Sequence, residues 1–221
     1  MVSAPSARDD ATVALARRVL AGFREKCGRT CAQRVILACA SDDEGMPEKV
    51  HRYLRLGFSE ERRLYTDVAA PEALALDALV RHVSTECEHT RQFVRFTKVP
   101  DGTFVAAFEP NANTLPLVGS HFSRRMREDR FLIVDPRHLV AIMHGPEDKG
   151  FTVVGLDSAT AEALAARTGE ADEQELYIHA MWRRFYQAMS LEGRSAAERG
   201  YDLRVKWMPK RFWKGMPEFG A

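Results

Sequence analysis

An apolar face held between residues 71 and 94 constrains the fold of this chain more than any other feature. Pro71 stands where the first turn of a helix tolerates proline, and apolar side chains then recur at three- and four-residue spacing as far as Val94. This spacing predicts one helix of about six turns. Because a single apolar stripe must be buried, we expect this helix to pack on the rest of the fold.

The remaining pattern predicts further helices and a small sheet. Asp101 and Gly102 suit a tight turn between two alternating runs, which predicts a β-hairpin, and three later runs predict an antiparallel meander. The fold class is therefore α+β: a helical N-terminal part and the long central helix packed on a small, mainly antiparallel sheet, followed by a C-terminal helix and a basic tail. Helical spacing recurs over residues 13–28, 47–57, 115–126 and 173–191.

The composition is that of an ordinary globular chain. Its 221 residues are 45% hydrophobic and 29% charged, which is enough to bury one core, and no linker or repeat interrupts the pattern. We therefore predict one domain over residues 1–221, with a flexible lead-in over 1–12 and a basic, aromatic tail over 200–221.

Charge and cysteine usage limit the compartment and the partners. No run reaches the roughly 20 apolar residues that a membrane-spanning helix needs, so we expect no membrane partner. The four cysteines do not resemble a secreted disulfide framework, so we predict reduced thiols in a cytoplasmic protein. The net charge of +1 gives no strong overall attraction for nucleic acid, so any contact with DNA must be a local basic patch.

Glu86 is a carboxylate inside the apolar stripe of the long predicted helix. Burying it unpaired would cost on the order of several kcal/mol, so it needs a partner, a proton or a pocket. Two hypotheses stay open: a structural ion pair or capped loop, and a general base or metal ligand beside His82 or His89. No second ligand pair accompanies Cys27 and Cys31, so we predict no metal site and no cofactor.

Polar side chains are densest in the segment that follows the predicted hairpin. His121 could act as an acid or base oriented by Asp135 or Glu109, which makes Glu86, His121 and Asp135 the candidate catalytic residues. Arginines of the same segment could clamp phosphate through bidentate contacts, or could be solvated helix ends with internal ion pairs. These arginines are Arg124, Arg125 and Arg137.

The C-terminal tail interleaves cationic and aromatic side chains. Lys and Arg neutralise phosphates while indole rings stack on unpaired bases, so this pattern favours sequence-tolerant binding to single strands or distorted duplex. The aromatic side chains could instead anchor the C-terminus in the core, with the charges solvated. The candidate nucleic-acid contacts of the tail are Trp207, Lys210, Arg211, Trp213 and Lys214.

Several short motifs follow one another along the chain: RYLRLGF from Arg52, FVRF ending at Phe96, the DG hairpin followed by EP at Glu109 and Pro110, LPL with HFSRR around His121, the D-x-R of Asp135 and Arg137, and MPKRFWK near the end. Their presence in this order resembles a family of uncharacterised DNA-repair or DNA-metabolism proteins. The resemblance covers most of the chain from about Pro47 onward. Members are typically encoded beside a DNA-modification radical-SAM protein, and some are fused to a uracil-DNA glycosylase-like domain. The resemblance therefore implies DNA and one of these two proteins as partners.

The chain departs from the family pattern on the long helix. Relatives have a glycine at the position of Gln92 and a histidine near Glu88, whereas this chain has its histidine one residue later, at His89. On this helix and just after it, the residues that still match the family pattern are therefore Glu86 and Arg95.

Three hypotheses about function follow. The first is a DNA-binding accessory module that acts with the radical-SAM or glycosylase-like partner, using Arg95, the three segment arginines and the tail. The second is a DNA- or nucleotide-directed enzyme whose candidate catalytic residues perform acid–base work, with or without a metal. The third is a protein-interaction module that docks through the tail and the helix around Trp182. No nucleophile elbow, P-loop or dinucleotide fingerprint supports the more familiar enzyme classes.

Overall fold

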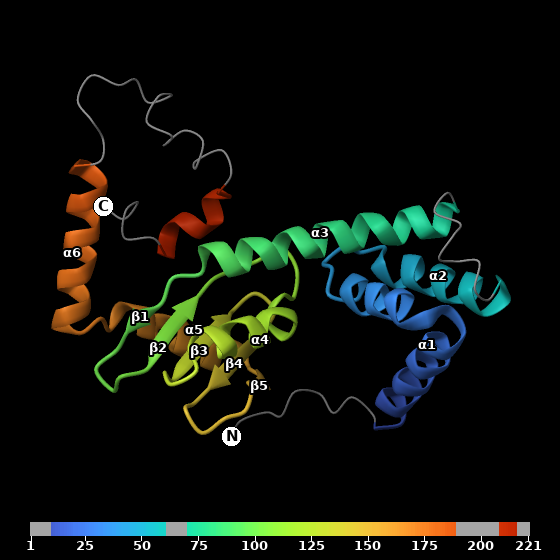
Figure 1. Ribbon diagram of the computed structural model, residues 1–221, viewed down its shortest axis with the longest axis horizontal. Coiled ribbons are helices and arrows are strands. Elements are labelled where there is room, and N and C mark those ends of the chain that lie inside the picture. Colours follow the sequence, from blue (N-terminus) through green and yellow to red (C-terminus); the bar gives the residue numbers. More distant parts are fainter. Residues whose placement is uncertain (1–9, 61–69, 189–207, 216–221) are drawn as a thin grey trace, which may run out of the picture. The chain divides into compact units, whose positions relative to one another are not determined.

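The computed structural model of the chain is an α+β fold, as the sequence predicts (Figure 1). It describes residues 10–60, 70–188 and 208–215. The described residues fall into two compact units. Unit 1 comprises the chain as far as Glu88 together with Asn111–Leu117, and unit 2 comprises His89–Pro110 and the chain from Val118 onward.

Both ends of the chain extend beyond the described residues. Of the lead-in expected over residues 1–12, residues 1–9 lie outside the described residues. Helix α1 begins at Asp10. The tail expected over 200–221 is described at residues 208–215. The organisation as one domain over residues 1–221 stays a prediction.

Unit 1 is built from helices. α1 spans Asp10–Ala38, α2 spans Met46–Glu60 and α3 spans Pro71–Phe93, the last turn of which belongs to unit 2. The helices expected from the spacing of apolar residues are confirmed. α1 is interrupted at Gly28, whose φ of 88° lies in the region that glycine adopts without steric cost. The sequence predicts the end of the first helix at this same residue.

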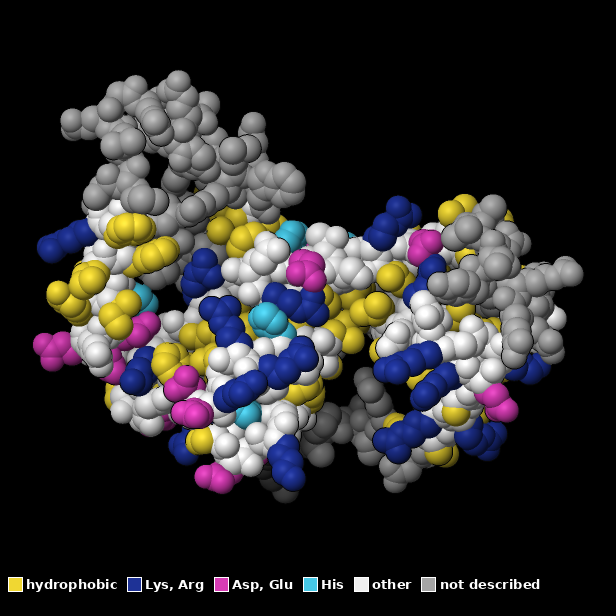
Figure 2. Space-filling model, in the orientation of Figure 1, with side chains coloured by type: hydrophobic (Ala, Val, Ile, Leu, Met, Phe, Trp, Pro, Cys, Tyr) yellow, Lys and Arg dark blue, Asp and Glu magenta, His cyan; other side chains and the backbone are white. Residues whose placement is uncertain are grey.

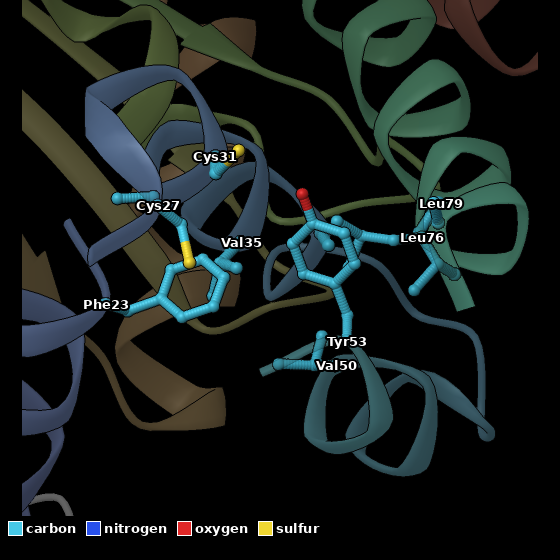
Figure 3. Close-up of a cluster of buried hydrophobic side chains, with 11 residues drawn as sticks. Phe23, Cys27, Cys31, Val35, Val50, Tyr53, Leu76 and Leu79 are labelled. Carbon is cyan, nitrogen blue, oxygen red and sulfur yellow. The ribbon is translucent and has the colours of Figure 1, made fainter. Parts of the chain in front are cut away.

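An apolar core joins the helices of unit 1 (Figure 3). Phe23 of α1 and Tyr53 of α2 are fully buried with their ring centroids 5.8 Å apart. The thiol of Cys27 donates a hydrogen bond to the carbonyl of Gly57 at 3.3 Å. Burial raises the pKa of the Tyr53 hydroxyl, and the neighbouring thiol of Cys31 adds to the rise. Cys27 and Cys31 form no disulfide and help to fill the core.

The described strands form one five-stranded sheet in unit 2, in the order β1-β2-β3-β4-β5. The expected hairpin, β1 with β2, and the expected meander, β3 to β5, are antiparallel and are confirmed. The pairing of β2 with β3 is parallel, so the sheet is mixed. The strands span Thr97–Lys98, Phe104–Ala107, Phe131–Asp135, Val140–His144 and Thr152–Gly155.

Helix α4, Leu115–Arg125, connects β2 to β3. A parallel pair needs such a crossover because a short turn cannot return the chain to the same end of the sheet. Phe122 of α4 is buried with its ring 6.4 Å from the ring of Phe131 in β3, so the helix packs on the sheet. The ring of Phe151, just before β5, lies against Gly119 of α4. The helix expected over residues 115–126 is confirmed.

The described part of the chain ends in helices. α5, Ser158–Ala166, packs on β2 and β3 and is capped by the carboxylate of Asp157, which accepts from Thr160 N at 2.8 Å. The sequence prediction missed this short helix. A 3₁₀ turn, η2, leads to α6. Their bounds are Arg167–Gly169 for η2, Glu173–Ala188 for α6 and Lys210–Gly215 for a last 3₁₀ segment, η4.

Substituting Gly119 by alanine should destabilise unit 2. A Cβ atom at this position would lie 2.3 Å from Cε2 of Phe151, so the ring and its loop must move. Overpacking of this kind costs about 1–3 kcal/mol, which urea denaturation of Gly119→Ala would measure. Gly169→Ala is the matched control because nothing lies within 4 Å of a Cβ there. Equal midpoints for the two variants would contradict the close packing of α4 on the Phe151 ring.

The hairpin turn between β1 and β2 is tied to η2 by an ion pair that should be visible in a pH titration. A hydrogen bond from Thr103, followed by the pair with Arg167 at 2.6 Å, lowers the pKa of Asp101 to about 2 from an ordinary value of 3.8. Because the folded-state pKa is depressed, Asp101 contributes stability above pH 3.8 and loses that contribution as the pH falls toward 2. Arg167→Gln should raise the pKa of Asp101, as measured by carboxyl NMR.

The control for this titration is Glu170→Gln, which removes the other acidic partner of Arg167. The pKa of Asp101 should stay depressed in this variant. An Asp101 pKa that does not respond to Arg167→Gln would mean that the ion pair does not persist in solution.

Candidate nucleic-acid interface

One edge of the unit 2 sheet collects cations from separate segments. Because β2 and β3 are parallel, their C-terminal ends lie at the same edge, and antiparallel β1 begins there. Arg95 precedes β1 by two residues and Arg137 follows β3 by two residues, so both exposed arginines flank this edge. Arg95 Nη1 also donates to Gln92 O at 3.1 Å, which satisfies a carbonyl at the end of α3.

The described part of the tail lies at the same edge. Phe212 of η4 is buried, with its ring 5.6 Å from Phe93 at the end of α3 and 6.1 Å from Phe108, which directly follows β2. Figure 1 shows η4 in red beside the end of α3. Lys210 and Arg211 are thereby brought beside the ends of the strands. We call the group of Arg95, Arg137, Lys210 and Arg211 the basic edge.

The aromatic side chains of the tail have mixed roles. Phe212 and Met208 are buried, as expected of anchors for the C-terminus. Trp213 is half-buried, and its Nε1 donates to Met208 O at 3.3 Å. Cations lie over two of the rings: Arg211 is 4.9 Å from the Phe212 centroid and Lys210 is 5.9 Å from the Trp213 centroid. Trp207 and the side chain of Lys214 lie outside the described residues.

The three arginines predicted to contact phosphate, Arg124, Arg125 and Arg137, lie in two separate places in the structure. Arg124 and Arg125 end α4, and β3 begins six residues later at Phe131. They therefore lie near the start of β3, whereas Arg137 follows its end, roughly 13 Å further along the strand. The sequence proximity of these arginines suggested a single clamp. The length of the intervening strand instead assigns Arg124 and Arg125 to the opposite edge of the sheet.

Asp135, at the end of β3, pairs with a histidine that the sequence analysis did not select. Its Oδ2 lies 2.6 Å from Nδ1 of His138, and Oδ1 accepts from the backbone N–H groups of Arg137 and His138. Burial raises the pKa of Asp135, while the hydrogen bond from His138 opposes the rise. Leu139 follows with φ of 52°, a left-handed conformation that closes this turn. The D-x-x-H spacing in a strand-to-strand turn was the available signal.

Glu86 accepts a hydrogen bond from the backbone of a loop in unit 1. It is 4% exposed, and its Oε2 accepts from the backbone N–H of Asn111 at 2.8 Å. His82, one turn earlier on α3, places Nε2 3.0 Å from the carbonyl of the same residue. Ala112 then pairs with Ser41 in an isolated bridge. Glu86 and His82 thus hold both polar backbone groups of Asn111, as expected of a carboxylate that caps a loop.

The candidate catalytic residues belong to different units. Glu86 lies in unit 1, whereas His121 and Asp135 lie in unit 2. The Asp135 carboxylate forms hydrogen bonds with Arg137 and His138 of its own turn, and His121 lies on α4 with its ring 5.2 Å from that of Phe122. Among the described residues, no group of three His, Cys, Asp or Glu side chains is placed to hold a metal ion. Their joint catalytic role stays a prediction.

Helix α6 carries an apolar stripe at helical spacing. Ile178, Met181, Trp182 and Phe185 lie at i, i+3, i+4 and i+7 and are 41–52% exposed. The rings of Trp182 and Phe185 stack with centroids 5.7 Å apart. Figure 2 shows this group in yellow over α6. The interaction role predicted for the helix around Trp182 stays a prediction.

The fold and the basic edge define a small α+β protein in which a mixed sheet presents cations beside the ends of its parallel strands. A family model described as DUF4130, a domain of unknown function, matches residues 44–218. The chain belongs to this family. Comparison with curated proteins and with solved structures gives no match. In the described part of the chain, no helix is long and apolar enough to cross a membrane.

Removing the imidazole of His138 should raise the pKa of Asp135 further. In His138→Leu the donor that opposes the effect of burial is lost, and a buried acceptor loses one hydrogen bond, at a cost of about 1–3 kcal/mol. Since the folded-state pKa already exceeds the ordinary value, ionisation of Asp135 costs stability as the pH rises through it. The loss in this variant should therefore be larger near neutrality than near about pH 4.

Carboxyl NMR and denaturant titration at several pH values would measure both effects. The double variant Asp135→Asn, His138→Leu should be destabilised by less than the sum of the single variants, because the two side chains share one contact. Strict additivity would show that the pair is not coupled in solution.

Proposed function

We propose that this chain is a DNA-binding accessory module whose basic edge contacts phosphates. The observation that carries this proposal is the convergence of Arg95, Arg137, Lys210 and Arg211 from three separate segments on one edge of a sheet. Convergence of this kind produces a local positive patch on a chain whose net charge is only +1. A local patch is what a protein without an overall basic excess needs to bind nucleic acid.

The charges of the edge are mainly positive. Asp135 is fully buried with its oxygens turned into hydrogen bonds of its own turn, so it contributes little field at the surface. Glu109 is an exposed carboxylate at this edge, following β2. Stacking on the Phe212 ring orients the guanidinium group of Arg211. Guanidinium groups held in one orientation favour bidentate contacts with phosphate oxygens.

The proposed role is accessory because the family resemblance associates such chains with a radical-SAM protein or a uracil-DNA glycosylase-like domain. In this proposal the partner supplies the chemistry, and the chain holds the DNA. Contacts limited to phosphates would make binding tolerant of sequence. The module would therefore deliver DNA to its partner without selecting a base.

Fluorescence anisotropy with single-stranded, duplex and uracil-containing DNA over a salt series tests the proposal. Arg95→Gln combined with Arg137→Gln removes two contacts at the basic edge. This variant should bind all three DNAs more weakly and flatten the log–log salt slope by roughly two. Arg124→Gln combined with Arg125→Gln removes the same charge at the opposite edge and should change the slope much less.

Equal effects of the two double variants would contradict the assignment of DNA to the basic edge. Absence of binding at low salt would contradict a DNA-binding role for the chain by itself. A preference for one of the three DNAs would identify the form of DNA that the module holds.

A further inference from the structure

We infer that a groove in unit 1 binds a nucleoside monophosphate, either as a free nucleotide or as one unit of a single strand. The groove has a volume of about 890 Å³ and lies between α1, α2 and the first turn of α3. Its walls include His51, Arg52, Leu54, Arg55, Phe58 and Glu72. The segment RYLRLGF supplies much of this lining and has no part in the proposed DNA contacts of unit 2.

The groove carries cationic side chains from α2, one of which is paired with a carboxylate that also lines the groove. Arg52 Nε is held by Glu48 Oε1 at 2.6 Å, which orients its guanidinium group. His51 and Arg55 lie one turn apart on α2, and both are exposed. The four-residue spacing places the two side chains beside each other on one face of the helix. Figure 2 shows further Lys and Arg side chains over α1.

The groove also has aromatic and apolar side chains. Phe58 is 38% exposed although its ring packs edge-to-face on the buried ring of Phe23, with centroids 5.6 Å apart. The ring is thus fixed in place and still reachable. Lys26 Nζ lies 6.0 Å from the Phe58 centroid, and Val19 extends the apolar wall from α1.

A nucleoside monophosphate complements this combination. Its phosphate suits His51 and Arg55, and its base has a flat apolar face that stacks on an aromatic ring such as that of Phe58. Glu72 lines the same groove and can accept a hydrogen bond from an exocyclic amino group of the base. An inorganic anion would use only the cationic side chains of the groove, and an apolar ligand only the aromatic and apolar ones.

The size of the groove agrees with this class of ligand. Pockets for small molecules typically enclose about 300–1,000 Å³, and most of their lining is apolar with a few placed polar groups. The described groove of about 890 Å³ lies within that range. The described residues that line it all belong to unit 1, so the inference does not require the basic edge of unit 2. Only the single-strand form of the ligand rests on the proposed function.

Amide NMR titration of the full chain with dCMP, dAMP, inorganic phosphate and a short single-stranded oligonucleotide tests the inference. Nucleotides should shift the signals of α2, and Arg55→Gln should weaken their binding at least about tenfold, since it removes a charge-assisted contact. Phe58→Leu should weaken nucleotide binding and leave phosphate binding unchanged. Arg81→Gln removes an exposed charge about 13 Å along α3 from Glu72 and should have no effect.

The outcomes separate the ligand sources and the two proposals. If Arg55→Gln weakens binding of the oligonucleotide, the occupant of the groove is one unit of a single strand. If this variant still binds the oligonucleotide but binds dCMP or dAMP more weakly, the occupant is the free nucleotide. Equal responses to phosphate and nucleotides, insensitive to Phe58→Leu, would overturn the inference in favour of a simple anion site. Absence of any shift on adding nucleotides would overturn the inference as well. The proposed DNA-binding function would still stand in that case if the chain shows salt-sensitive DNA binding that is lost on changing Arg95 and Arg137.

Discussion

The parallel pairing of β2 with β3 is the constraint on which unit 2 depends. A parallel pair forces the chain to cross from one end of the sheet to the other, and α4 is the element that makes this crossing. The crossing brings the C-terminal ends of both strands to one edge, where loop residues face solvent without interrupting the sheet. In open sheets with parallel strands, ligands bind outside such strand ends. The position of the basic edge thus follows from strand direction, and the aromatic contact between Phe108 and Phe212 adds the tail to it.

A buried carboxylate has a comparable role in unit 1. Glu86 occupies an apolar face of α3, where an uncompensated charge would be costly, and the backbone N–H of Asn111 compensates it. The loop that contains Asn111 is anchored by the same contact, because its backbone N–H donates to Glu86 and its carbonyl lies 3.0 Å from Nε2 of His82. The anomaly that made Glu86 a catalytic candidate is therefore also explained by loop anchoring. Burial of a carboxylate in a helix face is by itself an ambiguous signal of function.

Local patterns in the sequence predicted most of the fold. The apolar stripe after Pro71, the break at Gly28 and the turn at Asp101 each depend on residues close together in the chain, and each appears where expected. The parallel register of β2 and β3 depends on which distant strand pairs with which, and no local pattern encodes that choice. α5 was missed because its alanine-rich sequence, SATAEALAA, has little contrast between an apolar and a polar face.

The candidate site was harder to predict because it depends on distances that the sequence does not contain. Arg124 and Arg137 are close in the chain, but an extended strand separates them, whereas Arg95 and Arg137 are distant in the chain and flank one edge. A helix shortens the distance between residues to about 1.5 Å each, and a strand lengthens it to about 3.3 Å, so the same sequence separation gives different spatial reach. Clusters of charge in a sequence are therefore evidence of a site only after the elements that carry them have been assigned. The pair of Asp135 and His138 illustrates the converse, since a tight turn keeps both side chains within hydrogen-bonding distance.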